Sequence, residues 1–134
     1  MADESRNFQV EIITPERVFY TGEASMIEFT SIEGDMGVYK HHIPLTTVLA
    51  PGIVTITEDD GQKKAAVHAG FAEVLGEKVT LLAEIAEWPD EIDADRAERA
   101  KKRAEERLAA KTEDLDIVRA ELALKKALVR ISLK

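Results

Sequence analysis

The chain has 134 residues, a length that suits one ordinary domain or two very small ones. It is 45% hydrophobic and 33% charged with a net charge of -8 at pH 7, a balance typical of folded proteins and not of disordered chains. It contains no cysteine, which excludes disulfide bonds, thiolate metal sites and thiol catalysis.

The first 88 residues are predicted to form short β-strands. Four segments are rich in β-branched residues and largely alternate between apolar and polar positions: residues 8–13, 25–30, 52–57 and 78–82. Asp59–Asp60–Gly61 is expected to form a tight hairpin through a positive φ at glycine, and Leu75–Gly76–Glu77 is expected to do the same. The pattern predicts a small all-β sandwich or barrel.

Neither a secretion signal nor a bilayer span is expected in this part. The stretch Met1 to Arg6 lacks the basic and apolar regions of a secretory signal, which indicates that the protein stays where it is made. The longest uncharged run, His41 to Thr57, contains two prolines and several threonines and does not match a membrane helix. We expect any membrane association to come through a partner.

The usual catalytic and metal-binding motifs do not occur in the sequence. Gly34–Asp35–Met36–Gly37 lacks the third glycine of a dinucleotide fingerprint, so we interpret it as a turn. His41 and His42 point apart in an extended chain, which favours packed or interface histidines over a metal site. Asp59–Asp60 is explained by solvation on a hairpin, and no Ser–His–acid elbow occurs. We therefore expect no enzymatic activity and no metal.

The chain changes character near Trp88. Every glycine, proline and aromatic residue lies at or before residue 89. Residues 1 to 89 carry 6 basic and 15 acidic side chains, whereas residues 90 to 134 carry 12 and 11. A nucleic-acid surface needs clustered cations without nearby carboxylates, which neither part offers. We predict two domains, residues 1–88 and residues 89–134.

Beyond Asp93 the pattern predicts an antiparallel helical hairpin, so that the whole chain is of the α+β class. A stripe of small residues at helical spacing would permit close approach of a partner helix: Ala97, Ala100, Ala104 and Leu108. Thr112 is expected to cap the second helix. Its apolar stripe comprises Ile117, Ala120, Leu124, Leu128 and Ile131, widened by Leu115, Val118 and Leu122.

The stretch Glu91 to Ala97, EIDADRA, has two interpretations. As a helix start, Asp93 is the N-cap, Asp95 lies near the positive helix end, and Asp93 with Arg96 forms a surface pair. As a small-molecule site, the same side chains would bind a ligand where the two domains meet. From the residues alone the cap is favoured, because capping worth about 1 kcal/mol is enough to explain them.

Several strings in the chain resemble one known family. They are residues 31–39 followed by His42–Ile43–Pro44–Leu45, then residues 51–54, 68–74, 92–97 and 119–124. The first, a glycine-acid-x-glycine run followed by His-x-Pro-Leu, is the most specific. From end to end, the chain resembles the epsilon subunit of the bacterial and chloroplast rotary ATP synthase.

The resemblance implies a non-catalytic rotor subunit of the central stalk, which helps couple ion flow to ATP synthesis. In the family the sandwich packs on the gamma subunit and on the ring of c subunits. Asp35 and His42, in the expected loop region Gly34 to Leu45, would face these partners. The protein would be peripheral at the cytoplasmic face of a bacterial membrane rather than at a chloroplast thylakoid. Whether the coupling ion is H+ or Na+ stays open.

The helical hairpin, by the same resemblance, is a regulatory switch. Folded on the sandwich it permits turnover, and extended along gamma it obstructs ATP hydrolysis by the alpha/beta catalytic hexamer. In the extended form, four cationic residues would contact acidic surfaces of the catalytic subunits: Arg119, Lys125, Lys126 and Arg130.

Family members that bind ATP do so in the compact form, so ATP is the expected regulatory ligand, and no cofactor is required. Residue by residue, Glu87, Ile92 and Asp93 would serve the adenosine end, with Arg96, Arg103 and Arg130 near the phosphates. Lys126 stands where the ATP-binding relatives have arginine, and a lysine lacks the bidentate fork of a guanidinium.

The alternatives to a rotor subunit are a free-standing adaptor of the same architecture and a small nucleotide hydrolase.

Overall fold

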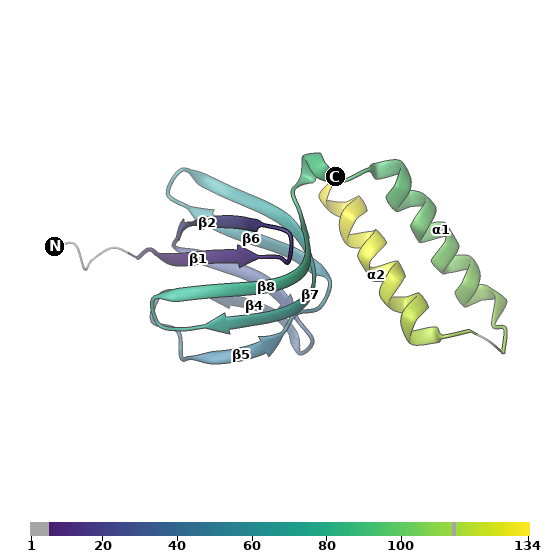
Figure 1. Ribbon diagram of the computed structural model, residues 1–134, viewed down its shortest axis with the longest axis horizontal. Helices are drawn as coiled ribbons and strands as arrows, with labels where there is room; N and C mark the ends of the chain where they lie inside the picture. Colours follow the sequence, from purple (N-terminus) through teal and green to yellow (C-terminus); the bar gives the residue numbers. More distant parts are fainter. Residues whose placement is uncertain (1–5, 114) are drawn as a thin grey trace.

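The computed structural model describes residues 6–113 and 115–134, in which a β-domain is followed by two helices (Figure 1). The strands are β1 (Phe8–Ile13), β2 (Val18–Ala24), β3 (Met26–Ser31), β4 (Gly34–Val38), β5 (Leu45–Val48), β6 (Gly52–Glu58), β7 (Gly61–Val74) and β8 (Lys78–Glu87). A short 3-10 helix, η2 (Pro89–Glu91), leads into α1 (Ala94–Ala110) and α2 (Ile117–Leu133). The predicted α+β fold, a β-sandwich followed by a helical hairpin, is confirmed.

The eight strands form a continuous sheet that folds over on itself. Its order is β2-β1-β8-β7-β6-β3-β4, with β5 also paired to β7. Only the pairing of β1 with β8 is parallel among these described strands. The first half of β7 pairs with β6 and the second half with β5, so β7 passes from one layer of the sandwich into the other.

The strand β7 bends at Ala69 and Gly70, whose φ angles are 59° and 119°. A Cβ atom on Gly70 would lie 1.9 Å from the carbonyl oxygen of Leu82, so glycine is required at this close approach. The expected hairpin at Asp59–Gly61 is confirmed, with Gly61 at a φ of 144°. The turn at Gly76 joins β7 to β8 without a positive φ, contrary to expectation.

The run Gly34 to Gly37 is a strand and not the turn that we expected. It makes up most of β4, which pairs with β3 in a register that sets Met36 opposite Phe29. The turn lies one step earlier, at Ile32 and Glu33. Strand propensity does not predict β4, because two of its residues are glycines and glycine adds no side chain to the alternating pattern.

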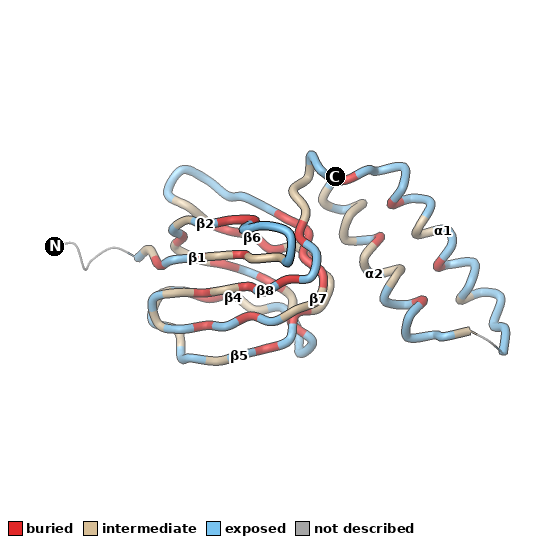
Figure 2. The backbone as a smooth tube through the Cα atoms, in the orientation of Figure 1, coloured by how far each residue is buried: buried red, intermediate tan, exposed pale blue. Residues whose placement is uncertain are grey.

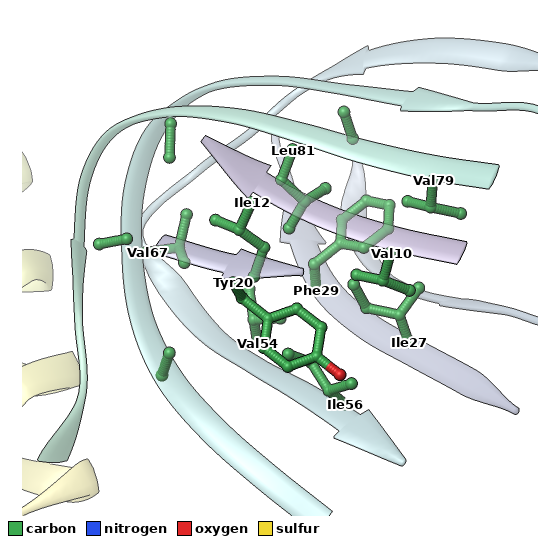
Figure 3. Packing of buried hydrophobic residues seen from close by; sticks show 14 of the residues in the cluster. Val10, Ile12, Tyr20, Ile27, Phe29, Val54, Ile56, Val67, Val79 and Leu81 are labelled. Carbon is green, nitrogen blue, oxygen red and sulfur yellow. The ribbon is translucent and has the colours of Figure 1, made fainter. Parts of the chain in front are cut away.

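The hydrophobic core lies between the two layers of the sandwich. Figure 3 shows side chains from several strands meeting there, among them Ile12 of β1, Phe29 of β3, Val54 of β6 and Leu81 of β8. All four are at most 2% exposed. Every residue of this core cluster belongs to the β-domain.

One segment of β7 is buried on both faces. Ala65 and Val67 face the core, whereas Ala66 and His68, which alternate with them, face outward and are also buried. The helix α2 contacts β7 and β6 and covers this outer face. The hairpin therefore docks on the sandwich through α2, with α1 on the far side (Figure 1).

Both helices begin at an aspartate. The Oδ1 atoms of Asp93 and Asp116 accept hydrogen bonds from the backbone N–H groups of Arg96 and Arg119, each at 3.0 Å. Thr112 lies in the connecting loop, so the expectation that it caps the second helix is wrong.

The helices pack through small residues, which Figure 2 marks as buried spots along each helix. The buried residues are Ala97 and Ala104 of α1 with Ala120 and Ala127 of α2. The expected stripe of α2 is wrong at four positions that are exposed: Ile117, Val118, Leu122 and Leu128. Periodicity locates an apolar face but does not show whether a neighbour covers its full width.

Candidate functional site

A hollow of about 450 Å³ lies where the β-domain meets the helices. Its wall comes from the end of β8, η2, the first half of α1 and the last turn of α2. The lining residues are Ile85, Glu87, Glu91, Asp93, Arg96, Ala97, Ala100, Arg103 and Arg130. Two of them, Ala97 and Ala100, are small, which leaves room between the longer side chains.

The charges in the hollow fall into two groups. Arg96 and Arg103 project from one face of α1 because their spacing of seven residues is two helical turns, and Arg130 reaches in from α2. The carboxylates come from the β8–α1 connection. A guanidinium pairs with phosphate oxygens through two parallel hydrogen bonds, so this arrangement suits an anionic phosphate group beside apolar surface.

Glu87 links the two domains across this hollow. Its Oε1 atom accepts a hydrogen bond from Nε of Arg130 at 2.7 Å, and both side chains are about one quarter exposed, at 25% and 26%. The pair fixes the last turn of α2 to the end of β8. A ligand that engages either side chain therefore acts directly on the contact that holds the hairpin down.

His68 lies directly beneath this pair. It is fully buried, and neither of its ring nitrogens has a hydrogen-bond partner among the described residues. Its Nε2 atom is 3.6 Å from Oε1 of Glu87, which is too long for a hydrogen bond. Burial, and then the positive charges of Arg130 and Lys126, lower the pKa of His68 from 6.5 to about 4, against a weaker opposing effect of Glu87. The imidazole is therefore neutral near pH 7.

The joint between the domains is tied to the sandwich at Glu91. Its Oε1 atom accepts hydrogen bonds from the backbone N–H of Trp88 at 2.9 Å and from Nη2 of Arg17 at 2.8 Å. These bonds, that of Arg17 foremost, lower the pKa of Glu91. Trp88 stacks on Phe19 with ring centroids 4.2 Å apart. The chain thus enters α1 in a defined direction.

The segment around β4 presents apolar side chains to solvent. Ile32, Tyr39 and Ile43 are 66%, 62% and 78% exposed. Asp35 accepts a hydrogen bond from Oγ1 of Thr30 at 2.9 Å, and Nδ1 of His42 lies 2.7 Å from the carbonyl oxygen of Ile43. Exposed apolar residues among polar ones are typical of a protein-binding surface.

Two family models together account for almost the whole chain. The β-sandwich domain of the ATP synthase delta/epsilon chain matches residues 7–89, and the long α-helix domain of the same chain matches residues 90–134. The chain belongs to the ATP synthase epsilon chain family. The resemblance that the sequence suggested is confirmed.

Curated relatives in this family are similar over most of their length. The ATP synthase epsilon chain of Caldanaerobacter subterraneus subsp. tengcongensis is 44% identical over 96% of this chain and 94% of its own. That of Brevibacillus brevis is 49% identical over 80% of this chain and 82% of its own.

Two solved structures share the fold of this epsilon chain family member. One is a chain of the Euglena gracilis mitochondrial ATP synthase, OSCP/F1/c-ring in rotational state 1, with a TM-score of 0.82 at 23% identity, covering 92% of this chain and 79% of that one. The other belongs to the central stalk/c-ring of the Tetrahymena thermophila enzyme, with a TM-score of 0.61 at 18% identity, covering 94% and 92%.

Most of the residues that family resemblance assigns to ATP gather in the hollow. Glu87, Asp93, Arg96, Arg103 and Arg130 all line it. Two do not. Ile92 is buried beside the hollow at 4% exposure, and Lys126, half-buried on α2, is close enough to His68 to influence its pKa. Asp93 caps α1, so the helix-start interpretation of EIDADRA describes a contact that is present.

The cations that the family resemblance assigns to inhibition lie on different faces of α2. Arg119 and Lys125 are exposed, whereas Lys126 and Arg130 face the sandwich and are half-buried. Arg130 is engaged with Glu87 in this arrangement. Only part of the set is therefore free to meet another protein while the hairpin is docked.

Sequence reasoning assigned no role to three residues that lie in or near the hollow: Arg17, His68 and Glu91. Glu91 had a signal, since an acidic residue three positions after a helix N-cap can accept a hydrogen bond from the N-cap backbone N–H, as it does here from Trp88. His68 had a weaker one, an apolar run of Ala65 to Val67 that indicates a strand segment covered on both faces. Arg17 had none, because its partner Glu91 is 74 residues away in the sequence.

The described part of the chain holds no group of three or more His, Cys, Asp or Glu side chains that could bind a metal ion. None of its helices is long and apolar enough to cross a membrane.

Proposed function

We propose that this chain is a non-catalytic rotor subunit of a bacterial ATP synthase, which helps couple ion flow through the c-ring to ATP synthesis and restrains ATP hydrolysis through its helical hairpin. The observation that carries the proposal is the match of both epsilon chain domains, in order, over residues 7–134. The subunit would sit at the cytoplasmic face of the membrane through the complex. No catalytic role is assigned to it, since the other subunits would carry the chemistry.

The sandwich is the proposed attachment to gamma and to the c-ring. The exposed apolar side chains of Ile32, Tyr39 and Ile43, near Asp35 and His42, support this assignment. Their burial against a partner would be favourable, at about 25 cal/mol for each Å² of apolar surface removed from water. Both similar solved structures are of complexes that include a c-ring.

The hairpin is the proposed regulatory element. In the docked form it leaves apolar side chains of α2 in water, with Ile117 55% exposed and Val118 78% exposed. Arg119 and Lys125 are exposed beside them. A helix that keeps unburied apolar and cationic positions after docking is suited to a second binding place, here along gamma and against the alpha/beta hexamer.

ATP is the proposed ligand of the hollow. Its size, its three arginines and its apolar wall at Ile85 and Ala100 suit an adenine nucleotide. The wall requires α1, α2 and β8 together, so ATP would bind only the docked form and would stabilise it in proportion to its occupancy. ATP would then release the restraint on the catalytic subunits when it is abundant.

The proposal is tested by assembling the ATP synthase with the full chain or with a chain that ends after Trp88. We expect the shortened chain to assemble with gamma and the c-ring equally well, and the resulting complex to hydrolyse ATP faster. Loss of assembly would contradict the role of the sandwich. An unchanged hydrolysis rate would contradict the role of the hairpin.

A further inference from the structure

We propose that His68 is a proton-sensitive release for the hairpin: a proton on its ring drives α2 off the sandwich. The inference rests on the proposed mobility of the hairpin and adds a second signal that acts on its position. It starts from a buried imidazole that the nucleotide site does not use and whose two nitrogens have no hydrogen-bond partner among the described residues.

The charges around His68 come from two different elements. Glu87, at 3.6 Å, belongs to β8 and stays with the sandwich. Arg130 and Lys126 belong to α2 and leave with the hairpin. A protonated ring in the docked form would therefore lie near two cations and would share one carboxylate with Arg130.

Release of the hairpin reverses this balance. The two cations depart, water reaches the outer face of β7, and Glu87 becomes free to pair with a charged imidazole. The released form therefore binds a proton on His68 more tightly than the docked form does. By linkage, protons must favour release.

The direction and range follow from the pKa of His68. Docking holds it at about 4, and release returns it toward the ordinary 6.5. Because the docked form has the lower pKa, docking is fully favoured above about pH 6.5 and weakens as the pH falls toward about 4. Between about pH 7.5 and about pH 5.5 the ratio of released to docked hairpin should rise about tenfold.

The experiment uses the full chain labelled for single-molecule energy transfer. The sequence has no native cysteine, so Asp60→Cys on the β6–β7 turn and Glu106→Cys on α1, both exposed, take the two dyes. Released and docked populations are counted across this pH range. We expect the ratio to rise about tenfold in the parent chain and to lose this rise in His68→Phe.

Three variants complete the design. His68→Gln replaces His68→Phe if the latter does not fold, because glutamine keeps a polar group without a titrating proton. Arg130→Met should raise the released fraction at neutral pH and reduce its pH dependence. Lys102→Met removes an exposed charge from α1, the other helix of the hairpin, and should change neither.

The outcomes distinguish the role of His68 from the mobility of the hairpin on which it rests. An equal pH dependence in the parent chain and in the His68 variants would overturn the role of His68. Release in Arg130→Met together with a parent chain whose released fraction does not change with pH would also overturn the role of His68. In that case the proposed mobility of the hairpin would still stand. A hairpin that stays docked in every variant at every pH would contradict mobility itself.

Discussion

Glu87 shows how one side chain at the end of a strand can serve three neighbours. Its carboxylate accepts the hydrogen bond of Arg130, lies 3.6 Å from His68 and lines the hollow. These contacts share one carboxylate. A phosphate that draws Arg130 away would therefore leave the negative charge of Glu87 to interact with His68 alone. Nucleotide and proton would thus act on the same contact.

Arg103 provides the sharpest test at the residue scale. It lines the hollow without an ion-pair partner in the described contacts, so Arg103→Ala should weaken ATP binding about tenfold, the effect of losing a charged hydrogen bond of about 1.5 kcal/mol. Fluorescence of Trp88, the sole tryptophan, reports the titration.

Arg99→Ala is the matched control, because Arg99 is an exposed arginine of the same helix that does not line the hollow. An equal loss of affinity in both variants would mean that net charge and not position determines binding. The absence of any signal up to millimolar ATP, a range that corresponds to about -4 kcal/mol, would remove ATP as the ligand.

At the scale of elements, α2 holds its place through few contacts. Its buried residues are two alanines. The side-chain bonds that tie it to the preceding part of the chain are the pair of Arg130 with Glu87 and the hydrogen bond from Lys134 to the carbonyl oxygen of Pro89. Burying alanines gains little from the hydrophobic effect compared with leucine or isoleucine. A helix held in this way can dock and undock at a small cost in free energy.

The cap of α2 should therefore be measurable by itself. Asp116→Ala should destabilise α2 by about 1 kcal/mol, because the backbone N–H of Arg119 at the helix start loses its side-chain acceptor. Amide hydrogen exchange in α2 should become about fivefold faster, while β7 and β8 are unaffected. Asp116→Asn keeps a capping oxygen and serves as the control. Equal exchange in Asp116→Ala and the parent chain would show that the cap does not limit opening.

For the molecule as a whole, the stability resides in the sandwich. Every member of the core cluster precedes the helices, and Trp88 packs against that core at its edge. The helices contribute their own buried alanines, and α2 contacts the sandwich at β7 and β6. The β-domain is therefore the stable part of the chain, and the helical hairpin is weakly attached to it.

This division predicts that residues 1–88 fold alone. The shortened chain should keep a cooperative urea transition and should lose no more than about 1 kcal/mol of unfolding free energy, mainly from exposing Ala66. Urea unfolding followed through Trp88 measures this. If the shortened chain is unfolded without urea, the hairpin contributes to the stability of the β-domain, which would contradict its weak attachment.

Local patterns in the sequence were enough for the class of fold and for several contacts. Alternation identified four strand regions, the absence of glycine marked the helical part, and Asp93 was recognised as a cap. These features depend on neighbours a few residues apart, which a sequence displays directly. Four of the eight strands, β2, β4, β5 and β7, were not predicted, and neither was the Asp116 cap. Two glycines obscure the alternation in β4, and Thr112 competed with Asp116 as the expected cap.

By itself, the sequence determined the two-part architecture, the family and most of the side chains that line the hollow. Only the tertiary structure decided that Glu87 pairs with Arg130, that His68 is buried beneath them, and that part of the apolar side of α2, including Ile117 and Val118, stays in water. The physical reason is distance along the chain: Glu87 and Arg130 are 43 residues apart. Which face of α2 is covered is set in the same way by its contacts with β7 and β6, strands that lie far from it in the sequence.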